Sequence, residues 1–398
     1  MIEDKWIMVL GGSNSQKHII KNAHELKLKV VLVDSRSNAE SKDAADIFCN
    51  VDPKNFQTVL EIARTYQIKG VFSDQNDYCI EALAYINKEM SFLGNSVESS
   101  RLATNKLSQK KYLSKISPEL IPQFWIFNTK ETLEEFVSEN PEKDFVLKPT
   151  NSQGSRGVIK INSRNIPKIE ELQFYNTNGK VEYLVEEYIG GYEFSVESII
   201  VEGEIFDLLI TRKYHYEKND CLDQENTYLD DIPEEIQKAL LEANSKVIKG
   251  LNLYFGLTHS EYKFYNGHVF LMEAAARGGG GGISSEIIPF MTDFDPMNYL
   301  IKYSIGMSRS KPRIQRKNNF CIMRFFNWEP GQVKLIQVPE WATKACLKLE
   351  ISIQVNETVK YPENSADRPG FFIVGGLNRQ STIELANQVE KSIVIEYK

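Results

Sequence analysis

The sequence is poor in cysteine and has no long apolar stretch. Its five cysteines lie far apart and form no Cys-x-x-Cys pair, which is typical of free thiols in a reducing compartment. No run reaches the roughly 18 apolar residues that a membrane-spanning helix needs, and residues 1–11 mix charged and apolar side chains too early for a signal peptide. These absences predict a cytoplasmic protein with neither a disulfide framework nor a membrane anchor.

The chain also lacks an excess of positive charge. Its formal net charge is -7 and its pI is near 5.5, so it has no long-range attraction for phosphate backbones or anionic lipid. Nucleic acids and membrane surfaces are therefore poor partners, whereas small molecules and a second copy of the chain, as a homodimer, remain open. A zinc site is rejected, because His215 and Cys221 have no second ligand pair at usable spacing.

The order of apolar segments predicts the fold class. A chain of 398 residues is long enough for roughly two to four domains. In its first quarter, strand-like runs alternate with amphipathic stretches, a pattern typical of a parallel sheet covered by helices. The predicted strands are 6–10, 30–33 and 71–74, and the predicted helices are 16–28 and 56–66. We therefore expect a Rossmann-like α/β domain at residues 1–103.

The pattern changes near residue 100, where prolines break a polar, lysine-bearing helix expected at 99–115. Beyond it we expect an α+β domain at 104–310, with a small lid subdomain at about 123–187, and a C-terminal lobe at 311–398. The predicted strands are 125–127, 145–148, 157–161, 182–187, 193–201, 205–213, 259–264 and 268–274, and the predicted helices are 132–138, 233–250 and 381–391.

A glycine turn after the first predicted strand resembles a dinucleotide fingerprint. Gly11 and Gly12 are followed by Asp34 at about the distance at which an acid holds a ribose hydroxyl. Gln16 stands where the third glycine belongs, so the turn is interpreted first as a strand-to-helix connection. A nicotinamide oxidoreductase remains one alternative.

Lys148 ends a predicted strand and is followed by a glycine-containing loop at 151–158. A cation beside mobile backbone amides suits a polyphosphate. The lysine precedes the glycines, so this is not a Walker loop. A hairpin turn would be the interpretation if the loop stood alone.

Consecutive carboxylates flank a second glycine connection, between the predicted strands at 182–187 and 193–201. An adenine edge needs an acceptor and a backbone donor, and a ribose diol needs a carboxylate. Glu187, Ile189 and Glu193 provide these groups at suitable spacing.

Two acids on adjacent predicted strands, Glu261 and Glu273, have the hard oxygens that Mg²⁺ prefers, with Mn²⁺ as an alternative. Arg277 follows them and could neutralise a phosphoryl group in transfer. The five glycines at 278–282 have the composition of a linker. Their place directly after Arg277 favours a loop that binds an acyl or phosphate group before a helix at 283–289.

Together these motifs resemble the ATP-grasp superfamily in order and spacing over nearly the whole chain. The segments THSEY, EAAARGGGGG and NSQGSRGV look like its carboxylate-amine ligase branch, near the L-amino acid ligases and carbamoyl-phosphate-synthase-like proteins. The resemblance implies an ATP-grasp fold with an N-terminal Rossmann-like pre-ATP domain and a small C-terminal lobe. It also implies ATP and Mg²⁺ as cofactors, and a small carboxylate and an amine as substrates.

The resemblance assigns roles to individual residues. Lys106 and Lys148 would contact ATP phosphates, Glu193 would bind the ribose, and Arg277 would act with Lys148 in catalysis. The loop residues that would close over the phosphates are Ser152, Gly154, Ser155 and Gly157, and the residues that would hold adenine are Glu186, Glu187, Tyr188 and Ile189. Glu261 and Glu273 would bind the metal. Weaker candidates for substrate contact are Arg156, His259, Gly280 and Ser284.

One position departs from the family pattern, because Ala275 stands where a metal-binding asparagine is common. The expected reaction forms an amide or peptide bond through an acyl phosphate, and we expect substrate selectivity to lie on loops after Gly282 and in 213–230. Alternatives are a phosphoribosylamine-glycine ligase, a bicarbonate-activating carboxylase component, and an ATP-binding module without catalysis, for which Ala275 is the best argument.

Overall fold

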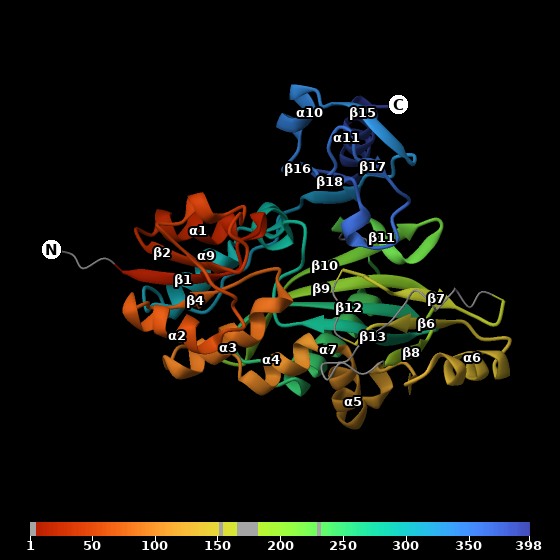
Figure 1. Cartoon of the computed structure of the whole chain (residues 1–398), viewed down its shortest axis with the longest axis horizontal. Coiled ribbons are helices and arrows are strands. Elements are labelled where there is room, and N and C mark those ends of the chain that lie inside the picture. Colours follow the sequence, from red (N-terminus) through yellow and green to blue (C-terminus); the bar gives the residue numbers. More distant parts are fainter. Residues whose placement is uncertain (1–4, 151–153, 165–181, 229–231) are drawn as a thin grey trace.

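The computed structural model describes residues 5–150, 154–164, 182–228 and 232–398. These residues build four sheets, with the N-terminal unit at one end, a long central sheet, and the C-terminal segment at the top of the view in Figure 1. None of the described helices is long and apolar enough to cross a membrane.

The N-terminal sheet is fully parallel, as predicted, with the order β3-β2-β1-β4. Helices cover both of its faces: α1 and the later α9 pack on one, α2 and α3 on the other. The strands are β1 (Trp6–Leu10), β2 (Lys29–Asp34), β3 (Ile47–Asn50) and β4 (Val71–Phe72), and the helices are α1 (Lys17–Glu25), α2 (Phe56–Thr65), α3 (Ile80–Glu89) and α9 (Pro296–Ser304). The sequence patterns missed β3 and α3.

The helix expected at 99–115 is instead two helices, α4 (Val97–Thr104) and α5 (Lys106–Ile116). Asn105 separates them in an extended conformation, and its side chain accepts a hydrogen bond from the Ser108 amide at 2.8 Å. An asparagine that caps the next helix competes with helix continuation, which explains the break. Lys106 is consequently the first residue of α5.

A small antiparallel sheet with the order β5-β8-β6-β7 forms the part predicted as a lid, and α6 packs on it through Leu133 and Val137. Its elements are β5 (Phe124–Phe127), α6 (Lys130–Glu139), β6 (Phe145–Lys148), β7 (Ile159–Ile161) and β8 (Tyr183–Glu187). The domain boundaries themselves stay predictions.

The central sheet has eight strands in the order β13-β12-β9-β10-β11-β14-β18-β16. Helix α7 (Glu234–Gly250) packs on its apolar face. The strands are β9 (Tyr192–Val201), β10 (Glu204–Tyr216), β11 (Asn219–Tyr228), β12 (Gly256–Tyr265), β13 (His268–Ala275), β14 (Phe320–Phe325), β16 (Lys348–Ile351) and β18 (Gly370–Gly376).

The prediction of a loop at 213–230 was wrong over most of that segment, because β10 and β11 form a long hairpin there. The β11 sequence is polar and has little intrinsic strand preference. Its conformation is imposed by β10 on one side and β14 on the other. Strands β14, β18 and β16 therefore extend the central sheet into the C-terminal segment.

Short helices and a three-stranded sheet with the order β17-β15-β19 make up the remaining described elements. The glycine run leads into a π-helix and then a short α-helix, rather than the single helix expected at 283–289. The π-helix is η6 (Ile283–Ile287), and α8 (Ile288–Met291) follows it. The later helices and strands are β15 (Gly331–Gln337), α10 (Glu340–Ala345), β17 (Thr358–Val359), α11 (Arg379–Ser392) and β19 (Val394–Tyr397). The 3-10 helices are η1 (Asn14–Gln16), η2 (Lys42–Ala44), η3 (Asp77–Cys79), η4 (Pro118–Leu120) and η7 (Ser365–Asp367).

The two glycines between β8 and β9 differ in the strain that a side chain would cause. Gly191 has φ +81°, and a Cβ there would lie 2.3 Å from the Phe264 carbonyl oxygen, whereas a Cβ on Gly190 would make ordinary contact with the Tyr265 ring at 3.4 Å. We expect Gly191→Ala to lower the free energy of unfolding by about 1–3 kcal/mol and Gly190→Ala to leave it nearly unchanged. Urea denaturation measures both variants, and equal losses would contradict the strain assigned to Gly191.

Candidate active site

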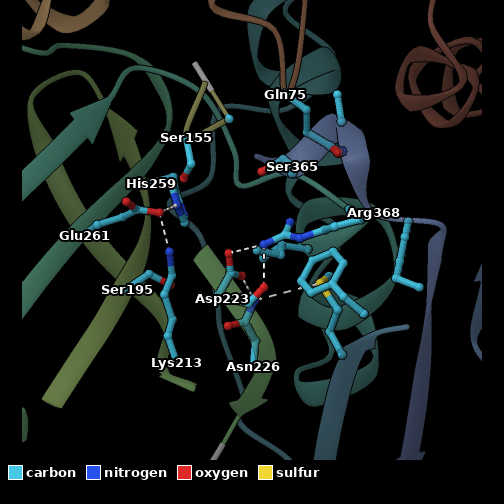
Figure 2. Close-up of a pocket in the computed structure, with 18 of the residues that line it drawn as sticks. Gln75, Ser155, Ser195, Lys213, Asp223, Asn226, His259, Glu261, Ser365 and Arg368 are labelled. Atoms are coloured by element: carbon cyan, nitrogen blue, oxygen red, sulfur yellow. Dashed lines mark hydrogen bonds and ion pairs between the residues drawn. The ribbon is translucent and has the colours of Figure 1, made fainter. Parts of the chain in front are cut away.

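A cavity of about 530 Å³ opens over the polar face of the central sheet. Figure 2 shows Lys213, His259 and Glu261 on one side of it and Arg368, from the C-terminal segment, reaching in from the other. A smaller hollow of about 90 Å³ lies between the lid sheet and the central sheet and shares lining residues with the cavity. The shared residues are Ser155, Glu193, Cys221, Glu261 and Glu273.

Strand alternation explains why this face is polar. Along β9, Glu193, Ser195 and Glu197 alternate with the buried Phe194 and Val196. The register then brings β12 alongside, so that His259 is paired with Glu197 and Lys263 with Glu193. The functional side chains of neighbouring strands therefore meet above the same surface.

Glu261 and Glu273, the predicted metal ligands, are directly opposite each other on β12 and β13, and the ladder is irregular just after Glu261. Glu261 is paired with Lys213 and with His259 Nε2 at 3.1 Å, and Glu273 is paired with Lys106. Burial alone would raise the pKa of Glu261, but Lys213 and His259 hold it well below the ordinary value. The carboxylate is thus ionised at neutral pH.

This donor set fits a magnesium ion bound together with a nucleotide. Two carboxylates supply hard oxygens, and Mg²⁺ takes most of its other ligands from phosphates and water. No group of three or more histidine, cysteine, aspartate or glutamate side chains that could hold a metal occurs within the described ranges. Ala275 lines the cavity, and its methyl group offers no metal ligand.

His259 lies between two carboxylates. Its Nδ1 contacts Glu197, which also accepts a hydrogen bond from the Gly279 amide at 3.3 Å. Burial would lower the pKa of His259, but Glu197 and Glu261 raise it to about 9. A histidine protonated at neutral pH is a cation rather than a free base. The sequence analysis missed Glu197, which the alternation Glu193-x-Ser195-x-Glu197 could have revealed.

Lys148 belongs to a buried cluster at the base of the smaller hollow. Glu186 accepts from Lys148 Nζ at 2.9 Å, and Lys110 Nζ lies 3.1 Å from the same oxygen. Burial lowers the pKa of Lys110 to about 8, whereas Glu186 raises that of Lys148 despite its burial. The sequence analysis missed Lys110, although it stands four residues after Lys106 on α5 and so faces the same side.

The predicted adenine and ribose residues line the smaller hollow. Glu187, Tyr188 and Ile189 form its edge at the connection between β8 and β9. Glu193 lies 3.1 Å from His215 Nε2 and 3.7 Å from Lys213 Nζ. Glu186 Oε2 is paired with Lys148 and Lys110, whereas its Oε1 has no hydrogen-bond partner in the described part of the chain.

The predicted phosphate loop bridges two parts of the structure. Ser155 Oγ donates to the Cys221 carbonyl at 3.1 Å, and the Gly154 carbonyl accepts from the Ser365 amide at 3.1 Å. Gly154, Ser155 and Gly157 all have positive φ, and Arg156 lines the larger cavity. Ser152 lies outside the described residues.

Arg277 forms a two-pronged ion pair with Asp77, both contacts being 2.7 Å, and also lines the cavity. The glycine run that follows is anchored rather than free. Gly278 donates to Asp74 Oδ1 at 2.9 Å, and the buried Ser284 donates to Asp74 as well. Gly280 faces open space in the cavity. The linker interpretation does not describe this segment.

The glycine turn near the N-terminus is used for local structure. Asp34 accepts from the Gly12 amide at 2.6 Å and from the Arg36 amide at 2.7 Å, and Arg36 also pairs with it. A carboxylate held this way is poorly placed to bind a ribose. This geometry supports the strand-to-helix connection over a nicotinamide site.

The pairing of His259 predicts a pH effect. We expect Glu197→Gln to lower the pKa of His259 by about one unit or more, because it removes a buried opposite charge. Since the pKa of about 9 is raised on folding, the stabilisation is full below about 6.5 and is lost as the pH rises through 9; in the variant the stabilisation is smaller and its loss is complete at lower pH. NMR titration of the histidine rings measures the shift, and Glu225→Gln, whose partner is Arg324, serves as control. An unchanged His259 titration in Glu197→Gln would refute the pairing.

Known proteins share parts of this sequence and its fold. A family model described as an ATP-grasp domain matches residues 142–286. A D-alanine–D-alanine ligase of Pelagibacter ubique (strain HTCC1062) is 28% identical over 196 residues, which are 47% of this chain and 62% of that protein. The chain spans 50–62% of the length of the curated relatives it matches.

Solved structures match over the full length. The crystal structure of an L-amino acid ligase from Bacillus licheniformis matches with a TM-score of 0.80 at 17% identity, and that of a phosphoribosylglycinamide synthetase from Anaerococcus prevotii with 0.74 at 18%; each match covers 100% of both chains. At such identities the likeness shows the fold. The chain therefore has the ATP-grasp fold and carries an ATP-grasp domain at residues 142–286, as the motifs predicted.

Proposed function

We propose that this protein is an ATP-dependent carboxylate-amine ligase, which forms an amide or peptide bond through an acyl phosphate and releases ADP and phosphate. The observation that carries the proposal is the facing pair Glu261 and Glu273, which lines a cavity of about 530 Å³ together with Lys213 and Arg277. Lys106 pairs with Glu273 from the smaller hollow. Carboxylates and cations arranged in this way suit a magnesium triphosphate. Both a D-alanine–D-alanine ligase and an L-amino acid ligase are among its relatives and structural neighbours.

In this proposal the nucleotide occupies the smaller hollow. Lys106 and Lys148 contact the phosphates, the segment 186–189 holds adenine, and Glu193 binds the ribose. The lining of the hollow supports this assignment, because an apolar wall of Val146, Val158 and Ile189 accompanies the polar groups. The loop that includes Gly154, Ser155 and Gly157 covers the phosphates and excludes water.

Glu261 and Glu273 would hold Mg²⁺, with Mn²⁺ as an alternative, and the ion would neutralise charge on the phosphates. The substrate carboxylate attacks the γ-phosphorus of ATP, the bond to the bridging oxygen breaks, and ADP leaves. The uncharged amine then attacks the acyl carbon, phosphate leaves, and the proton that the nitrogen sheds goes to the departing phosphate. Arg277 and protonated His259 stabilise negative charge, and the buried lysines orient the phosphates.

A second candidate is an ATP-binding module without turnover. Ala275 favours it, because this methyl group cannot bind a second metal ion. Other ATP-grasp chemistries, such as joining glycine to phosphoribosylamine or activating bicarbonate, share the nucleotide site and differ in the substrate part of the cavity.

The metal assignment predicts the effect of one substitution. Glu273→Gln should abolish turnover with little loss of stability, because it removes a metal-binding charge from a strand end rather than core packing. ADP release and thermal unfolding are the two measurements. Glu225→Gln, another salt-bridged strand glutamate that lies away from the cavity, should leave turnover unchanged. Turnover that survives in Glu273→Gln would contradict the assignment.

The reaction itself is tested with a matrix of amino acids and small carboxylates against amines, read by ADP release and by the mass of the condensed product. The ligase should release ADP only with particular pairs and should transfer ¹⁸O from the carboxylate to phosphate. Nucleotide binding without ADP release across the whole matrix would favour the noncatalytic module.

A further inference from the structure

We propose that the C-terminal segment forms the pocket for the amine substrate, and that this pocket selects an amino acid with a free carboxylate, bound by Arg368, and an apolar side chain. The proposal rests on the ligase function and names its acceptor. Its basis is the half of the cavity that lies opposite His259 and Glu261 (Figure 2).

Arg368 precedes β18 and enters the cavity from the side opposite His259 and Glu261. Its side chain is more than nine-tenths buried, so bulk water hydrates its charge only weakly. Among the described residues, it is the one cation that the segment after Pro312 contributes to the cavity lining. A buried arginine in a ligand-sized cavity requires an anionic partner.

Asp223 on β11 is the partner that the structure provides. Arg368 Nη2 donates to both the backbone carbonyl and the side chain of Asp223, and its guanidinium carbon lies over the Phe325 ring, 3.6 Å from the ring centroid. These contacts orient a guanidinium that also lines the cavity, which suits binding of a second carboxylate.

The wall beside Arg368 is apolar. Met323 and Phe325 come from β14, Phe371 from β18 and Ile283 from η6, and all four line the cavity. A cavity of about 530 Å³ has room for an amino acid side chain in addition to the transferred phosphoryl group. Apolar surface next to a single cation is the surrounding expected for the carboxylate and side chain of an amino acid.

The carboxylates at this end already have cationic neighbours. Asp223 is paired with Arg368 and interacts with Lys213, and Glu350 lies 3.5 Å from Lys348 Nζ. A zwitterionic amino acid carries only one negative charge. With its carboxylate on Arg368, its amine can point across the cavity towards Glu261 and Glu273, where the acyl phosphate would form.

Amide analogues test the role of Arg368. The wild type should use free amino acids as acceptors with a kcat/KM about 10-fold or more above that of the corresponding amino acid amides. Arg368→Gln should reduce this ratio to near one and leave the KM for ATP unchanged, while Arg368→Lys should retain part of the preference. Arg324→Gln is the matched control, because Arg324 pairs with Glu225 and Glu390 and does not line the cavity.

The apolar wall is tested separately. Met323→Ala should raise the KM for large apolar acceptors by about 10-fold and change that for alanine little. An Arg368→Gln enzyme that still prefers free acids, or a Met323→Ala enzyme with unchanged side-chain preference, would overturn the proposed pocket while leaving the ligase function intact.

Calorimetry separates failure of the pocket from failure of the ligase. Binding of free leucine and of leucine amide is measured with a nonhydrolysable ATP analogue present, so no turnover is needed. Tighter binding of leucine that depends on Arg368 supports the pocket even if no ADP is released. Equal binding of acid and amide by the wild type overturns it, and thermal unfolding checks that each variant is folded.

Discussion

The structure depends on the placement of two like charges opposite each other. Glu261 and Glu273 would repel one another if they stood alone on adjacent strands, and removal from water makes each charge costly. Lys106 and Lys213 compensate from opposite directions, one from α5 and one from β10. A site that requires four elements to balance its charges fixes the relative positions of those elements, and so organises the whole central cavity.

Much of this arrangement could be predicted from local pattern. Lys148 and Arg277 stand at or just after a strand end, and Glu261 and Glu273 lie on neighbouring predicted strands, which pair so that the two acids are opposite each other. The parallel N-terminal sheet followed from alternation of strands and helices. The break at Asn105 escaped because a capping side chain decided it, against a helix pattern that continued on both sides.

The rest of the cavity could not be predicted because it depends on long-range pairing. Asp223 lies on β11, a strand with a polar sequence that is specified by its neighbours rather than by its own residues. Glu197 takes its significance from its register with β12, Lys213 from the pairing of β10 with β9, and Arg368 from a connection before β18. Sequence motifs identify residues that share a segment, whereas these residues share only a surface.

Extension of the central sheet by β14, β18 and β16 has a practical consequence. A fragment cut to residues 142–286 would keep the segment that matches the family model but would lose β14, the partner of β11. The β11 edge would then expose unpaired backbone groups, and such edges invite association between chains. The smallest soluble unit of this protein must therefore include its C-terminal strands, and crystallisation or truncation work should preserve them.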